Sequence, residues 1–208
     1  MVRVKICGIT NAEDARLSVE AGADALGFIF VEGTPRFLTP EAAARITREL
    51  PPFVTAVGVF WDHAPGHVKA IAEQCGLGAL QFHGDEPPEA LPGADRLIIK
   101  TIKVTGPESL AAMDRYRVSA FLLDSPARWS EGEQRAPIPW ELARRASARV
   151  PIILSGGLSP DNVGAAVRFA RPFAVDVVSG VEARPGKKDP DKVRRFIALA
   201  KAAGDETP

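Results

Sequence analysis

The sequence predicts a single α/β domain folded as a (β/α)8 barrel (TIM barrel). Apolar segments rich in β-branched residues recur along the 208-residue chain, and a segment of helical character follows each of them. No Pro-, Gly- or Ser-rich linker interrupts this alternation, so residues 1–203 are expected to form one domain. A doubly wound open sheet is the alternative arrangement of the same elements.

The predicted strands are short apolar runs, typical of strands that are buried on both faces of a parallel sheet. They lie at residues 2–7, 25–30, 54–60, 79–82, 97–102, 120–123, 152–154 and 174–178.

The predicted helices alternate with these strands, at residues 12–21, 40–50, 65–75, 88–91, 107–116, 140–146, 160–169 and 190–203. Thr39-Pro40, Ser159-Pro160 and Asp189-Pro190 each place a capping side chain before a proline, a combination that favours the start of a helix. Residues 204–208 are expected to form a frayed tail.

Composition excludes several classes of protein. The 26 basic and 26 acidic side chains balance, so no nucleic-acid partner is expected. No apolar run approaches the roughly 18 residues of a membrane span, and the chain start does not have the pattern of a signal peptide. A soluble, cytoplasmic protein with no membrane partner is therefore expected. His63 and His67 have the spacing of metal ligands but no third ligand beside them, so no metal site is predicted.

The C-terminal ends of barrel strands are where active sites gather, and three reactive side chains occur there. Cys7 ends the first strand and could be a reactive thiol or a small buried apolar residue. Asp124 follows an apolar run that would raise its pKa and allow it to act as an acid, although it could also cap a turn. His83 could line the pocket or bond to the backbone. The second cysteine, Cys75, ends a helix at the opposite face of the barrel, so no disulfide is expected.

Strand alternation predicts what lies beneath Cys7. Lys5 shares a face with Cys7, one layer below it, and could lower the pKa of the thiol. Asp176 is expected to point inward from the last strand, which is adjacent to the first in a closed barrel. A buried Lys5–Asp176 pair is therefore expected, and it would weaken the effect of Lys5 on Cys7.

Two binding features are also expected. Glycine turns follow the seventh and eighth strands, where barrels usually bind phosphate because backbone N–H groups can approach an anion closely. The predicted phosphate-binding residues are Gly156, Gly157, Ser179 and Gly180, with ordinary turn geometry as the alternative. Arg36, after the second strand, could bind a substrate carboxylate or be an ordinary surface residue.

Taken together, these motifs resemble one known family. Segments 5–10, 35–36, 80–84, 122–125, 155–163 and 176–189 are similar, in order, to phosphoribosylanthranilate isomerase of tryptophan biosynthesis. The resemblance implies a (β/α)8 barrel that needs no cofactor or metal. It also implies an Amadori rearrangement of a small phosphoribosyl substrate, N-(5-phosphoribosyl)anthranilate. Cys7 would be the general base, Asp124 the general acid, and Arg36 the ligand of the anthranilate carboxylate.

One segment departs from the family pattern. Residues 126–139 lack the family's glycine-rich run after the sixth strand, which leaves the contacts of this loop open, including any made by Arg128 or Arg135. The rival interpretations are an indoleglycerol-phosphate synthase, a non-catalytic phosphosugar-binding protein and a thiol redox protein. The Cys7–Asp124 pair and the lack of a Cys-x-x-Cys motif argue against them. The sequence is compatible with a monomer or a homodimer.

Overall fold

A computed structural model of the protein describes residues 1–91, 95–126 and 136–206, and in it eight parallel strands close into a barrel. The ring closes because β1 pairs with both β2 and β8, which confirms the predicted (β/α)8 barrel and excludes the open sheet. The barrel strands are β1 (Arg3–Cys7), β2 (Ala25–Ile29), β3 (Thr55–Phe60), β4 (Ala79–Phe82), β5 (Leu97–Lys103), β6 (Ala120–Asp124), β7 (Ile152–Leu154) and β8 (Ala174–Val177).

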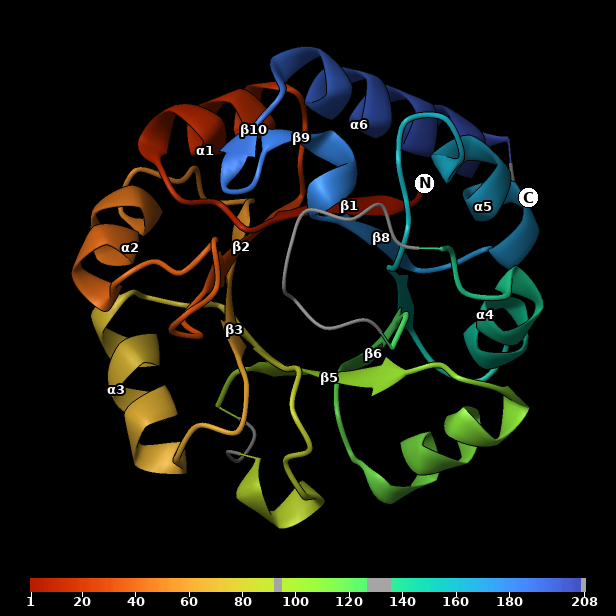
Figure 1. Ribbon diagram of the computed structural model, residues 1–208, viewed down its shortest axis with the longest axis horizontal. Coiled ribbons are helices and arrows are strands. Elements are labelled where there is room, and N and C mark those ends of the chain that lie inside the picture. Colours follow the sequence, from red (N-terminus) through yellow and green to blue (C-terminus); the bar gives the residue numbers. More distant parts are fainter. Residues whose placement is uncertain (92–94, 127–135, 207–208) are drawn as a thin grey trace.

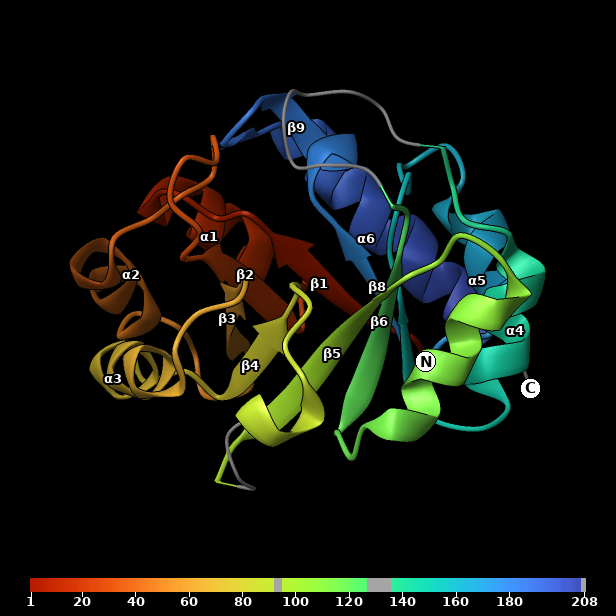
Figure 2. The ribbon, with the colours of Figure 1, turned by 60° about the horizontal axis from the view of Figure 1, so that its bottom comes forward.

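Helices form an outer ring around these strands (Figures 1 and 2). The α-helices are α1 (Ala12–Glu20), α2 (Pro40–Thr47), α3 (Pro65–Gln74), α4 (Trp140–Ser147), α5 (Val163–Ala170) and α6 (Pro190–Asp205). Short 3₁₀ helices are η1 (Pro88–Ala90), η2 (Pro107–Arg115) and η3 (Ser179–Val181). Within the described ranges, no helix is both long enough and apolar enough to cross a membrane.

Two of the three predicted helix caps are confirmed and one is wrong. Thr39 and Asp189 accept hydrogen bonds from backbone N–H groups in the first turns of α2 and α6. Ser159 does not cap α5, which begins at Val163 instead of Pro160. Asn162 accounts for the later start of α5. Its side chain accepts from the Ser159 N–H and donates to the Gly157 carbonyl, which folds this stretch into a turn.

The helix predicted at residues 107–116 is confirmed, as a 3₁₀ helix over Pro107–Arg115. Two further features differ from the sequence prediction. A two-stranded hairpin, β9 (Glu182–Arg184) with β10 (Lys187–Lys188), follows η3 and was not predicted. The last helix continues to Asp205, beyond the expected start of a frayed tail, because Gly204 packs against the backbone of Val2.

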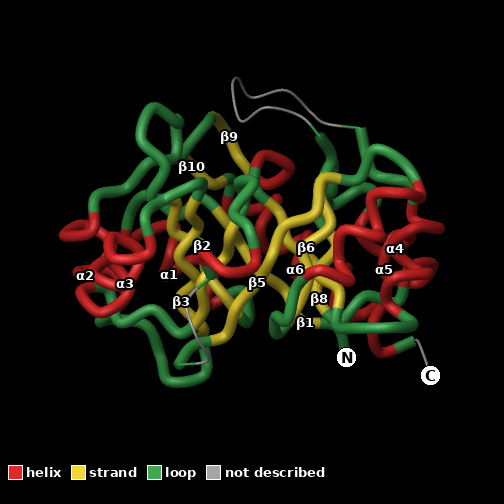
Figure 3. The backbone as a smooth tube through the Cα atoms, turned by 90° about the horizontal axis from the view of Figure 1, so that it is seen from below, coloured by secondary structure: helices red, strands yellow, loops and turns green. Residues whose placement is uncertain are grey.

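The barrel interior is apolar at one end and polar at the other. Inward-facing residues of the strand starts form a buried apolar cluster that includes Val57, Ile99, Leu122 and Ile153. Nearer the C-terminal ends of the strands, buried polar side chains replace them. The hairpin of β9 and β10 also lies at this polar end, opposite the two termini (Figure 3). The side chains that could take part in a reaction are therefore at the C-terminal end of the barrel.

Candidate active site

Cys7 is the last residue of β1 and is buried beside Ile29 and Val59. Its sulfur occupies the space that a side chain at Gly27 of β2 would fill. Burial raises the pKa of the Cys7 thiol; the positive charge of Lys5 opposes this rise and the negative charge of Asp176 adds to it. The thiol is therefore the resting form of Cys7. Cys75, at the end of α3, is likewise a free, buried thiol, and burial raises its pKa to about 11.

The predicted Lys5–Asp176 pair is confirmed. Lys5 Nζ donates to Asp176 Oδ1 at 2.8 Å, and both side chains are buried. Ser155 Oγ donates to the other carboxylate oxygen at 3.2 Å. Burial alone would lower the pKa of Lys5, but the charges and hydrogen bonds of Asp176 and Cys7 together outweigh this effect and raise it. Lys5 therefore stays charged beneath Cys7 and shares its charge with a carboxylate.

Asp124 ends β6 in a buried polar group that also contains His83. The Ser125 backbone N–H donates to Asp124 Oδ1 at 2.8 Å, and His83 Nε2 lies 3.6 Å from Asp124 Oδ2. On the other side of the imidazole ring, His83 Nδ1 lies 3.2 Å from Thr101 Oγ1 and 3.4 Å from Gln81 Nε2. His83 is therefore buried among polar side chains of the neighbouring strands, and its role in lining a substrate pocket stays a prediction. Gln81 and Thr101 were missed, although strand alternation would have placed both of them inside the barrel.

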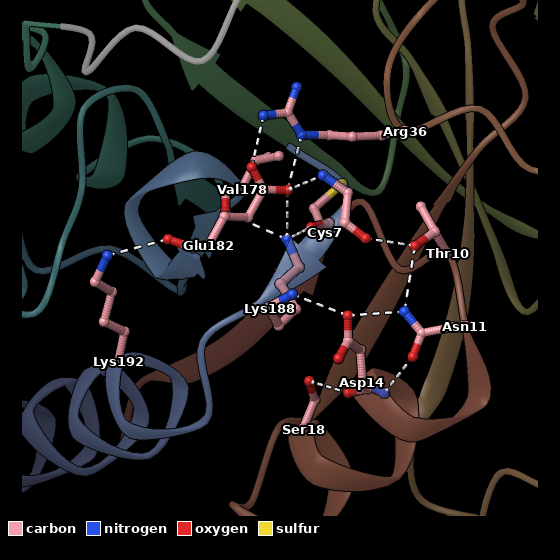
Figure 4. A network of polar contacts seen from close by, with 11 residues as sticks. Cys7, Thr10, Asn11, Asp14, Ser18, Arg36, Val178, Glu182, Lys188 and Lys192 are labelled. Atoms are coloured by element: carbon pink, nitrogen blue, oxygen red, sulfur yellow. Dashed lines mark hydrogen bonds and ion pairs between the residues drawn. The ribbon is translucent and has the colours of Figure 1, made fainter. Parts of the chain in front are cut away.

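Arg36 is buried and not an ordinary surface residue (Figure 4). Its Nε and Nη2 atoms donate to the two carboxylate oxygens of Glu182 at 2.9 and 2.6 Å. Burial alone would raise the pKa of Glu182, but the hydrogen bonds from Arg36 and the charge of Lys188 lower it. This pairing could not be predicted from the sequence, because Glu182 belongs to the unpredicted hairpin.

The two predicted phosphate loops lie against each other. Gly156 and Gly157 both adopt positive φ angles, of 80° and 64°, which favour glycine. Within the described part of the chain, the backbone N–H groups of these two residues have no hydrogen-bond acceptor. Gly180 packs so closely on the Leu158 carbonyl that a side chain would collide with it. This geometry suits the binding of an anion by backbone N–H groups.

The site therefore combines groups for acid–base chemistry with groups that can bind anions. A carboxyl group and a thiol end two different strands of one barrel, and a buried guanidinium and two glycine loops accompany them. Among the described residues, no group of three or more His, Cys, Asp or Glu side chains is placed to hold a metal ion. Arg128 and Arg135, the candidates for further anion contacts, lie outside the described residues.

Comparison with known proteins gives a consistent answer. Residues 4–198 match the sequence profile of the family N-(5'phosphoribosyl)anthranilate (PRA) isomerase. The N-(5'-phosphoribosyl)anthranilate isomerase of Geobacter sp. (strain M21) is 54% identical over 201 residues, covering 97% of this chain and 98% of that protein. The protein of the same name from Pelobacter propionicus is 49% identical over 207 residues, covering 100% and 99%.

Solved structures agree with the sequence relatives. Phosphoribosyl anthranilate isomerase from Thermotoga maritima superposes with a TM-score of 0.91 at 46% identity, covering 97% of this chain and 100% of that one. A phosphoribosyl anthranilate isomerase in complex with reduced 1-(o-carboxyphenylamino)-1-deoxyribulose 5-phosphate has a TM-score of 0.88 at 45% identity, with the same coverage.

Proposed function

The chain belongs to the N-(5'-phosphoribosyl)anthranilate isomerase family of tryptophan biosynthesis, and from this premise we propose that Cys7 is its general base and Asp124 its general acid. The reaction would convert N-(5-phosphoribosyl)anthranilate to 1-(2-carboxyphenylamino)-1-deoxyribulose 5-phosphate. The observation that carries the proposal is the position of the two side chains. Each is the last residue of a barrel strand, and each is buried at the C-terminal end where barrel enzymes act.

The proposed chemistry has two proton transfers. Asp124 donates a proton to the ribose ring oxygen, the C1′–O bond breaks, and the open sugar becomes a protonated Schiff base. Cys7, as thiolate, then removes the C2′ proton, and the electron pair left on C2′ gives an enolamine that tautomerises to the ketone. Burial favours the neutral thiol of Cys7 in the free enzyme. The cationic Schiff base would favour the thiolate at the step that requires it.

Binding groups would hold the substrate at both ends. The guanidinium of Arg36 would bind the anthranilate carboxylate, and the loops at Gly156, Gly157, Ser179 and Gly180 would bind the phosphate. His83, 3.6 Å from Asp124, would contact the sugar beside the acid. Two anchored ends would fix the sugar between acid and base, which reduces the entropy cost of reaching the reactive geometry.

The test is the loss of phosphoribosylanthranilate fluorescence with purified wild type, Cys7→Ala and Asp124→Asn. Each variant is expected to fold and to lose about two or more powers of ten in kcat, because each lacks one proton transfer. Cys75→Ala and Asp161→Asn are matched controls, since the first removes the other buried thiol and the second an exposed carboxylate paired with Arg195. Near wild-type turnover in Cys7→Ala or Asp124→Asn would refute the role assigned to that residue.

The remaining expectations concern the whole protein. We propose one domain over residues 1–203, extended by the end of α6, and the cytoplasmic location stays a prediction. The relative from Thermotoga maritima is dimeric, and mutually generated monomers of it have also been solved. For this chain, both a monomer and a homodimer remain compatible with the proposed site.

A further inference from the structure

Glu182 is the centre of a buried polar network that joins three separate parts of the chain (Figure 4). Besides the two hydrogen bonds from Arg36, its Oε1 atom accepts from Lys188 Nζ at 3.2 Å and from the Gly186 backbone N–H at 3.2 Å. The Glu182 side chain is 4% exposed. A carboxylate with this many donors is held in one orientation.

Lys188 anchors this carboxylate to the strand ends. Its side chain is fully buried, and Nζ donates to the Cys7 carbonyl at 2.6 Å and the Val178 carbonyl at 3.2 Å as well as to Glu182. These three bonds use all the donors of an ammonium group. Glu182 is therefore tied through Lys188 to the end of β1, which carries Cys7, and to Val178, which directly follows β8.

Arg36 depends on Glu182 for its orientation. Glu182 engages the Nε edge of the guanidinium, and among the described residues no second carboxylate engages its other edge. In Figure 4 the remaining nitrogen of Arg36 points away from Glu182. A planar guanidinium can bind one carboxylate along each edge, so the pairing leaves an edge with the geometry for a second carboxylate.

The balance of charge also favours a second carboxylate beside Arg36. Burial lowers the pKa of Lys188, but the three acceptors around its Nζ fit an ammonium group, so Arg36 and Lys188 supply two buried positive charges and Glu182 one negative charge between them. Buried charges need partners, so this group has a deficit of one anion. The proposed substrate carries a carboxylate at the end that Arg36 would bind.

We propose that Glu182 is the positioning residue that presents Arg36 to the anthranilate carboxylate. This inference rests on the proposed function, because it takes Arg36 as the carboxylate ligand. Glu182 would not touch the substrate. It would act by fixing the plane of the guanidinium and by pairing its own buried charge with those of Arg36 and Lys188.

The test compares two ligands by calorimetry, so it does not depend on turnover. One ligand is reduced 1-(o-carboxyphenylamino)-1-deoxyribulose 5-phosphate, and the other is the same compound without its carboxylate. The proteins are wild type, Glu182→Gln, Arg36→Met and the double variant. Glu13→Gln is the matched control, because Glu13 is an exposed carboxylate that pairs with Lys187 of the same hairpin.

Glu182→Gln is expected to weaken binding of the carboxylate ligand about ten- to a hundredfold, the range for a lost hydrogen bond to a charged group. Binding of the ligand without the carboxylate should stay within about twofold. The double variant should bind no more weakly than Arg36→Met, because Glu182 acts through Arg36. Equal weakening of both ligands by Glu182→Gln, or additive losses in the double variant, would show a general structural role and overturn the inference.

Two results separate this inference from the proposed function. Unchanged carboxylate preference in Arg36→Met would refute the role of Arg36 itself, whereas unchanged preference in Glu182→Gln alone would refute only the inference. If Glu182→Gln does not fold, Glu182→Asp replaces it. The shorter side chain keeps the buried charge but is not expected to reach both nitrogens of Arg36, so retained carboxylate preference would again contradict the proposal.

Discussion

At the scale of single residues, two opposite charges act on one thiol. Lys5 and Asp176 form a buried pair beneath Cys7; Lys5 lowers the pKa of the thiol and Asp176 raises it. Burial raises the pKa of Cys7 by more than the charge of Lys5 lowers it, so the pKa lies above its ordinary value. The pair therefore tunes the fraction of thiolate without producing a permanent one.

This arrangement predicts pH shifts of opposite sign. Thiolate forms as the pH rises through the pKa, so a higher pKa moves the reactive range to higher pH. Lys5→Met removes the charge that lowers the pKa, and its rate of alkylation by iodoacetamide should rise only at higher pH than in wild type. Asp176→Asn keeps an oxygen acceptor for Lys5 but removes the charge that raises the pKa, so its profile should move to lower pH.

The measurement uses a Cys75→Ser background, so that only Cys7 is alkylated. Shifts in the same direction for both variants would contradict the electrostatic account and indicate a change of packing around the thiol.

Lys5 and Asp176 could be paired from sequence because strand alternation and barrel closure are regular. The partner of Arg36 could not, since Glu182 belongs to the short hairpin of β9 and β10, outside the regular strands of the barrel.

At the scale of elements, the hairpin of β9 and β10 is fastened to α1. Asp14 of α1 is buried and accepts from the Lys188 backbone N–H at 2.9 Å and from Lys187 Nζ at 2.7 Å. Asn11, the residue that caps α1, also donates to Asp14 at 2.9 Å. One side chain thus joins a helix start to the hairpin that carries Glu182.

Asp14→Asn should therefore lower the free energy of unfolding by about 1.5–3 kcal/mol, the range for buried hydrogen bonds to a charged group. Glu13→Gln, which removes the exposed partner of the same Lys187, should change it by no more than about 0.5 kcal/mol. Urea denaturation followed by circular dichroism measures both. Equal effects of the two substitutions would mean that burial of Asp14 does not strengthen the link.

Elements could be predicted from sequence where they are long or periodic. Each barrel strand was located because its segment is largely apolar and a helical segment follows it. The hairpin was missed because its strands are only three and two residues long and largely charged. The start of α5 was misplaced because Asn162 closes a local turn with Ser159 and Gly157, a contact that the Ser-Pro pattern does not reveal.

At the scale of the whole molecule, α6 closes the structure by joining the end of the chain to its beginning. It packs against α5 and α1 and against β1, the strand that ends at Cys7. Gly204, near the end of α6, approaches the Val2 backbone so closely that a Cβ atom would lie 2.6 Å from the Val2 nitrogen. This contact holds the start and the end of the described chain together.

Gly204→Ala should consequently destabilise the protein, although the same change usually stabilises a helix. Replacing a helical glycine by alanine gains up to about 1 kcal/mol, but forcing a methyl group into a packed contact costs about 1–3 kcal/mol. Gly164→Ala in α5 is the matched control, because its nearest neighbour is the flexible end of Arg168 at 3.5 Å. In chemical denaturation, Gly204→Ala should lower the free energy of unfolding and Gly164→Ala should raise it. A stabilised Gly204→Ala would show that α6 can move away from Val2 at no cost, and that the contact between the chain ends does not stabilise the protein.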